Sequence, residues 1–192
     1  MTEKIEYKGY TIKVELDDEC YESPREWDNA GKMVCFHNNY NLGDKHDFYN
    51  AADFMEWLEE NEKDLIYLPL YLYDHSGISM STSTSYPFNC PWDSGQVGFI
   101  YVDRETMLKE WGYKNITKKR REFIENILRG EVAIYDQYLT GEVYGYIVED
   151  EEGEHLDSCW GFYDKEYMIS EAESAIDYEH KNTYHQIELI PA

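Results

Sequence analysis

Two long apolar runs mark the centre of the chain, at 65–73 (LIYLPLYLY) and 97–102 (VGFIYV). Both are rich in Leu, Ile, Val, Tyr and Phe, which is typical of central strands whose two faces are largely buried. Pro69 lies inside the first run and has no N–H to donate, so we expect a bulge or an unpaired edge there. The runs predict two central strands of a sheet.

Alternating apolar and polar positions predict two hairpins. One covers 5–16, with Lys8-Gly9 as its turn, and the other pairs 142–150 with 155–163. Shorter strands are expected at 33–37 and 184–190, and a polar loop at 17–29.

Apolar residues that recur every three or four positions predict helices. Gly130 interrupts one of them and predicts a kink or a break. The basic run at 118–121 occupies the first turn of the same helix, where the helix dipole disfavours cations, so we expect an acidic partner inside the fold or on a second copy of the chain. The expected helices are 50–62 after the N-cap Asn50, 104–112 between Asp103 and Gly112, 118–138 after Thr117, and 165–180.

This order of elements favours an α+β fold. We expect a mixed or largely antiparallel sheet with three to four helices packed mainly on one side. The length of 192 residues favours one domain over 1–192 rather than two. An acidic hairpin and helix at about 142–192 would form its C-terminal portion.

The composition is that of a folded but strongly acidic protein, with 40 acidic and 17 basic residues and a net charge of -23. This charge repels nucleic acids and anionic membranes and attracts basic partners. No signal peptide is recognisable, and no apolar stretch reaches the roughly 20 residues of a membrane span. The four cysteines include no CxxC pair, so we expect a cytoplasmic protein with reduced thiols.

Over half of the net charge lies between Glu142 and Glu179, with thirteen acidic residues and one base, Lys165. Carboxylates at this density could imitate a phosphate backbone, which carries one charge per about 1.7 Å of duplex. The alternative is a solvated acidic face without a partner. The residues expected to bind a partner here are Glu149, Asp150, Glu151, Glu152, Glu154, Asp157, Glu171 and Glu173.

Asp74-His75-Ser76 contains the residue types of a catalytic triad, but consecutive residues cannot assemble one. A catalytic hypothesis pairs His75 with the Cys90 thiol, with Asp93 or Asp74 orienting the imidazole. We favour the alternative, a turn in which Asp74 and Ser76 bind backbone groups.

The segment 90–95, CPWDSG, predicts a rigid turn in which Trp92 is buried as a core anchor. Alternatively, Trp92 and Gln96 line a pocket for a planar ligand or a partner's side chain, together with the Tyr-rich strand 65–73. We expect the polar ends of Asp93 and Gln96 to be more exposed than Trp92.

Metal and nucleotide binding have little support in the sequence. His37, Asp44 and His46 share one loop, but their spacing matches no standard zinc pattern. No Walker A or GxGxxG motif occurs. We therefore expect no metal and no cofactor.

The chain contains the segments REWDNAGKMVCFHNNYNLGD, LPLYLYDHSG, CPWDSGQVGFIYV, RGEVAIYDQYLTGEVYGYIVED and DSCWGF, between about 25 and 162. These segments resemble a family of uncharacterised acidic proteins encoded by bacteriophages, prophages and plasmids. The resemblance implies a small cytoplasmic protein of the bacterial host and transfers no catalytic residue. By analogy of class, strongly acidic folded proteins of mobile elements are often inhibitors of host defence, including DNA-mimic anti-restriction and anti-CRISPR proteins.

These observations favour a protein that acts by binding rather than by catalysis. We expect an inhibitor that occupies the basic surface of a host defence or nucleic-acid-binding protein, without direct contact to nucleic acid or membrane, as a monomer or a homodimer. The alternatives are a small cysteine/histidine-dependent hydrolase or transferase, and a module that sequesters a small ligand.

Overall fold

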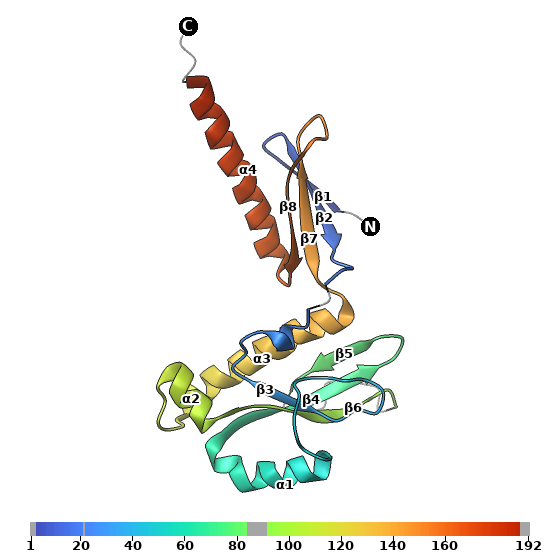
Figure 1. Ribbon diagram of the computed structural model, residues 1–192, viewed down its shortest axis with the longest axis vertical. Coiled ribbons are helices and arrows are strands. Elements are labelled where there is room, and N and C mark those ends of the chain that lie inside the picture. Colours follow the sequence, from blue (N-terminus) through green and yellow to red (C-terminus); the bar gives the residue numbers. More distant parts are fainter. Residues whose placement is uncertain (1–2, 21, 84–91, 189–192) are drawn as a thin grey trace. The chain divides into compact units, whose positions relative to one another are not determined.

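The protein is described by a computed structural model, which covers residues 3–20, 22–83 and 92–188, with side chains up to Lys181. The chain forms two compact units (Figure 1). We call residues 1–21 and 141–192 the terminal unit and residues 22–140 the inserted unit. This division does not test the prediction of a single domain, because two compact units can still unfold as one cooperative domain.

The terminal unit contains a four-stranded antiparallel sheet. Lys8 and Gly9 have positive φ angles of 51° and 84°, as a two-residue hairpin turn with the right-handed twist of its strands requires. The predicted N-terminal and C-terminal hairpins are both present, and β2 and β7 pair to join them into one sheet. The strand order is β1 (Glu3–Tyr7), β2 (Tyr10–Leu16), β7 (Tyr144–Glu149) and β8 (His155–Phe162).

The helix α4 (Lys165–Glu188) packs on one face of this sheet (Figure 1). Its residues Met168, Ala172 and Ile176 are fully buried, because positions four apart share one face of a helix. The predicted strand 184–190 is wrong for residues 184–188, which continue α4. Each residue added to an existing helix gains one backbone hydrogen bond, whereas a terminal strand first needs a free sheet edge.

The inserted unit contains the two predicted central strands, which pair with each other. Its sheet is also antiparallel, and its register shifts between Leu70 and Tyr71, next to Pro69. The irregularity expected at Pro69 is thus displaced by one residue. The strand order is β3 (Lys32–Cys35), β6 (Ser94–Asp103), β4 (Leu65–Asp74) and β5 (Ile78–Ser81).

Helices cover both faces of this second sheet rather than mainly one (Figure 1). Ile124 and Leu128 of α3 (Lys118–Thr140) pack on one face, and Phe54 and Leu58 of α1 (Ala51–Asn61) pack on the other. The remaining elements are the helix α2 (Arg104–Trp111) and the short 3-10 turns η1 (Pro24–Glu26) and η2 (Glu62–Asp64). The α+β class is confirmed, with two antiparallel sheets in place of one.

The predicted helix ends are confirmed where a side chain or a glycine fixes them. The Asn50 and Asp103 side chains accept hydrogen bonds from the backbone N–H groups of Asp53 and Thr106. Gly112 ends α2 with a positive φ of 66°. In contrast, α3 runs through Gly130 without a break.

The basic first turn of α3 finds local partners. Arg120 lies over the Tyr113 ring and donates a hydrogen bond to the Asn115 carbonyl oxygen, while Lys118 lies 3.9 Å from Glu122 on the same helix. A contact with a second copy of the chain stays a prediction.

Among the described residues, no helix combines the length and the apolar character that a membrane span requires.

Candidate functional site

The turn between β4 and β5 brings two of the candidate catalytic residues together. The Asp74 N–H donates to the Asp93 carbonyl oxygen at 2.7 Å, which holds the start of β6 beside this turn. His75 Nδ1 then lies 3.3 Å from an Asp93 carboxylate oxygen. The imidazole is 63% exposed, and Asp74 instead accepts a hydrogen bond from the Tyr40 hydroxyl. Of the two aspartates considered for orienting His75, Asp93 is therefore the one beside the imidazole, at a solvent-exposed position.

The candidate nucleophile Cys90 lies outside the described residues. A catalytic triad needs a nucleophile as well as the histidine and the aspartate that orients it. The nucleophile must contact the imidazole nitrogen that the aspartate does not bind. The hypothesis of a cysteine/histidine-dependent hydrolase or transferase therefore stays a prediction.

Trp92 and Gln96 line one hollow of about 380 Å³ beside this turn, together with Asp74 and Asp93. The prediction that Trp92 is a core anchor is wrong, because its side chain is 93% exposed. Trp92 precedes β6, which begins at Ser94, so it lies outside the paired strand. Gln96 is exposed, as expected, but Asp93 is only about one third exposed, so the expectation that it would be more exposed than Trp92 is wrong.

The exposure of Trp92 leads to a prediction on stability. Trp92→Ala will change the free energy of unfolding by less than about 0.5 kcal/mol, the usual range for exposed positions. In the control Trp57→Ala, the lost ring packs against Phe54 and Tyr101, so stability falls measurably. Thermal denaturation of both variants beside the parent tests this. A Trp92→Ala melting curve shifted as far as that of the control would contradict it.

The three residues considered for metal binding have other contacts. Asp44 pairs with Arg25, His46 Nε2 lies 3.2 Å from the Cys35 carbonyl oxygen, and His37 stacks on Tyr40. Across the described ranges, no group of three or more His, Cys, Asp or Glu side chains could hold a metal ion.

Charge is unevenly divided between the two units. The terminal unit has 20 acidic and 5 basic residues, a net charge of -15, and the inserted unit has 20 acidic and 12 basic residues, a net charge of -8. The terminal unit is the smaller of the two. The excess negative charge therefore lies on the sheet and helix formed by the two ends of the chain.

Half of the carboxylates predicted to bind a partner have partners within the terminal unit. Glu149 forms a 2.5 Å ion pair with Lys13, and the Asp157 carboxylate accepts a hydrogen bond from the Tyr146 hydroxyl. The hydrogen bond to the Glu171 carboxylate raises the pKa of Tyr167. Asp150 accepts two backbone N–H groups of the β7–β8 turn, at 2.8 and 3.0 Å. These four carboxylates shape the unit.

Three of the predicted carboxylates are exposed at the tip of the β7–β8 hairpin. Asp150 and Gly153, with a φ of 84°, close the turn that displays Glu151, Glu152 and Glu154. All three side chains are exposed, whereas Glu173 on α4 is half-buried. We call Glu151, Glu152 and Glu154 the acidic tip.

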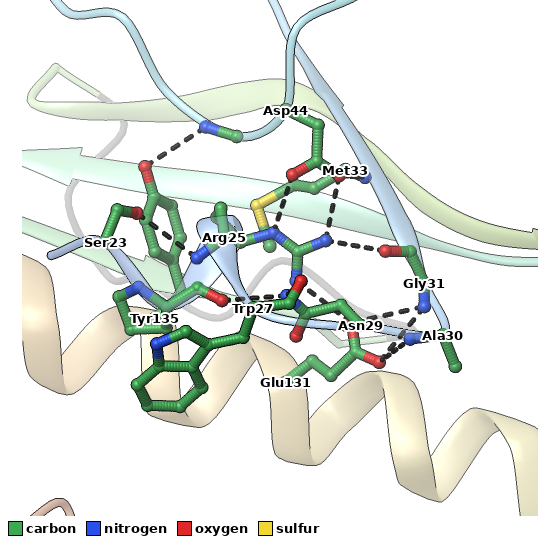
Figure 2. Close-up of polar contacts among 12 residues, drawn as sticks. Ser23, Arg25, Trp27, Asn29, Ala30, Gly31, Met33, Asp44, Glu131 and Tyr135 are labelled. Carbon is green, nitrogen blue, oxygen red and sulfur yellow. Dashed lines mark hydrogen bonds and ion pairs between the residues drawn. The ribbon is translucent and has the colours of Figure 1, made fainter.

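A charged cluster that the sequence analysis missed lies inside the inserted unit (Figure 2). The Arg25 side chain is 4% exposed and binds Asp44 through two hydrogen bonds, of 3.0 and 2.8 Å. It also binds Glu131 at 2.9 Å and the Gly31 carbonyl oxygen at 2.6 Å. Burial is the largest influence and lowers the pKa of Arg25, but the hydrogen bonds and charges of Asp44 and Glu131 together outweigh it, so the pKa lies above the ordinary value.

Both acidic partners of Arg25 also hold backbone groups in place. Glu131 accepts the N–H groups of Ala30 and Gly31, and Asp44 accepts that of Met33 at 2.7 Å. We call Arg25, Asp44 and Glu131 the arginine cluster. It ties η1, the start of β3 and the helix α3 together, so its first role is structural.

Comparison of the chain with protein-family models, curated proteins and solved structures finds no match.

Proposed function

We propose that this protein acts by binding, as an acidic inhibitor that occupies the basic surface of a host defence or nucleic-acid-binding protein. The observation that carries the proposal is the acidic tip on a unit with a net charge of -15. Five of the six residues from 149 to 154 are acidic. A basic groove built to hold phosphates attracts such a surface, and charge of this size steers the encounter.

The carboxylates that are already paired within the terminal unit indicate which residues contact the partner. A carboxylate that is already paired, such as Glu149 with Lys13, gains less from a cationic partner than a hydrated one does. The acidic tip is free of this limitation, since its side chains extend into solvent. We therefore place the first contact at the acidic tip and assign Glu149, Asp150, Asp157 and Glu171 to its support.

The resemblance to acidic proteins of phages, prophages and plasmids motivates the choice of partner. On a mobile element, a folded protein that competes with DNA or RNA for a host protein would protect the element from nucleases. The partner would bind the terminal unit in place of nucleic acid, so the complex should weaken as salt screens the charges.

The test compares the parent with two matched triple variants. We expect Glu151→Gln, Glu152→Gln and Glu154→Gln together to reduce capture of a nucleic-acid-binding protein from bacterial lysate roughly tenfold at about 50 mM salt. The control replaces Glu56, Glu59 and Glu60 on α1, which are also exposed. It makes the same change in net charge on the other unit and should retain capture.

Two further measurements belong to this test: identification of the captured protein and its release by nucleic acid or salt. The captured protein, identified by mass spectrometry, should be released by added DNA or RNA and by about 500 mM salt. The proposal is contradicted if no nucleic-acid-binding protein is enriched at low salt, or if both triple variants lose capture equally.

A further inference from the structure

A second hollow in the inserted unit, of about 750 Å³, has nearly twice the volume of the one beside Trp92. It lies between η1, the loop 40–45 and the C-terminal turns of α3. Its apolar lining consists mainly of Leu42, Ile78, Leu139 and the rings of Tyr135 and Tyr138. The volume falls within the roughly 300–1,000 Å³ of small-molecule sites, which are mostly apolar with a few polar groups.

Two nearly parallel aromatic rings line this hollow. Tyr135 and Tyr138 are one helical turn apart on α3, and their ring planes differ by 14° with centroids 6.1 Å apart. Tyr135 is 3% exposed and accepts a hydrogen bond from the Gly43 N–H, so the position of its ring is fixed. Nearly parallel aromatic rings favour a flat ring system packed against them.

Two buried donors at this hollow keep hydrogens without an acceptor among the described residues. The Tyr135 oxygen accepts the Gly43 N–H at 3.1 Å, which leaves its own hydroxyl proton to donate (Figure 2). Burial raises the pKa of Tyr135, so this proton is retained at neutral pH. Arg25 has five N–H groups, and the contacts with Asp44, Glu131 and Gly31 use four of them.

Buried donors of this kind cost free energy unless something accepts from them. A ligand that offers acceptors on a planar body would satisfy both and fill the apolar space. Charge argues against an anion, because Arg25 and Lys45 in the lining are balanced by Glu26 and Asp44. Glu131, which also binds Arg25, makes the surroundings slightly negative.

We propose that this hollow binds a neutral, planar heteroaromatic molecule of the nucleobase or nucleoside class. The Tyr135 and Tyr138 rings would pack against its flat face. Arg25 and the Tyr135 hydroxyl would donate to its carbonyl oxygens or ring nitrogens. This site is on the inserted unit, so it does not depend on the acidic tip or on the proposed inhibitor function.

The experiment measures binding of adenosine, guanosine, cytidine and uridine by ligand-observed NMR and isothermal titration. At least one nucleoside should bind with a Kd below about 1 mM, the weak end of specific affinities. Tyr138→Ala, at a half-buried position, should weaken that binding at least roughly tenfold. Tyr49→Ala is the control, because Tyr49 is 92% exposed and lies outside the hollow.

The same experiment can overturn the inference in three ways. No binding by any of the four nucleosides would show that solvent alone satisfies the two donors. Equal binding by the parent and Tyr138→Ala would place the nucleoside elsewhere. Tighter binding of the corresponding 5′-monophosphates than of the nucleosides, by tenfold or more, would contradict the charge balance. Tyr135→Phe, checked for an unchanged melting curve, should lower affinity by removing one donor.

Discussion

Arg25→Ala will lower the free energy of unfolding of the inserted unit by about 3–5 kcal/mol, because it leaves two largely buried carboxylates without their cation. The side chains of Asp44 and Glu131 are only 20% and 12% exposed. Water can therefore replace the guanidinium only in part. Urea denaturation followed by tryptophan fluorescence measures the loss, since four of the five tryptophans lie in the inserted unit.

Two further variants separate the geometry of the arginine cluster from its charge. Arg25→Lys keeps the positive charge but cannot make the paired hydrogen bonds to Asp44, so we expect an intermediate loss. Lys109→Ala breaks an exposed ion pair with Glu110 and should leave the denaturation curve unchanged. An Arg25→Ala curve that overlays the parent would mean that the cluster does not hold the fold.

Local signals in the sequence predicted local structure well. A Lys-Gly turn, the caps Asn50 and Asp103, and the positive φ of Gly112 each act within four residues. Such features depend on the chemistry of a few neighbouring side chains. The same reasoning could not reveal the two units, because Ile12 pairs with Val148 across most of the chain.

In the candidate site, too, local features could be predicted from the sequence and long-range contacts could not. The catalytic hypothesis left open whether Asp74 or Asp93 orients His75, and the structure places Asp93 3.3 Å from the imidazole. Which carboxylates of the acidic segment remain free could not be predicted. Glu149 is paired because β2 brings Lys13 beside it from 136 residues away.

Trp92 and the arginine cluster show why residue type alone misleads. Tryptophan is usually well buried and arginine usually exposed; here Trp92 is 93% exposed and the Arg25 side chain 4% exposed. In the first case, Trp92 lies before the start of β6, outside the paired strand. Two carboxylates from distant segments decide the second, because a buried guanidinium needs charged partners.

Gly98→Ala will destabilise the inserted unit by about 3 kcal/mol or more, the upper end of the usual cost of overpacking a core. A Cβ at Gly98 would lie 1.9 Å from the Val34 carbonyl oxygen and 3.0 Å from Cys35 Cα. Both atoms belong to the backbone of β3, which pairs with β6 at this position. No side-chain rotation can relieve the clash, so β3 must move away from its partner.

Displacement of β3 carries a large cost because its side chains reach both faces of the sheet. Met33 packs in the cluster that includes α3, Val34 packs in the cluster that includes α1, and both are fully buried. Their contacts and the hydrogen bonds of β3 would be lost together. Hydrogen exchange should therefore show the amides of β3 losing protection before those of β4.

Gly95→Ala is the matched control for Gly98→Ala, because it lies on the same strand and a Cβ there meets nothing within 4 Å. We expect its stability to stay within about 1 kcal/mol of the parent, since alanine mainly restricts the unfolded chain at such a site. Urea denaturation of both variants gives the comparison. Equal midpoints for the two variants would show that β3 does not approach Gly98 as closely as the structure places it.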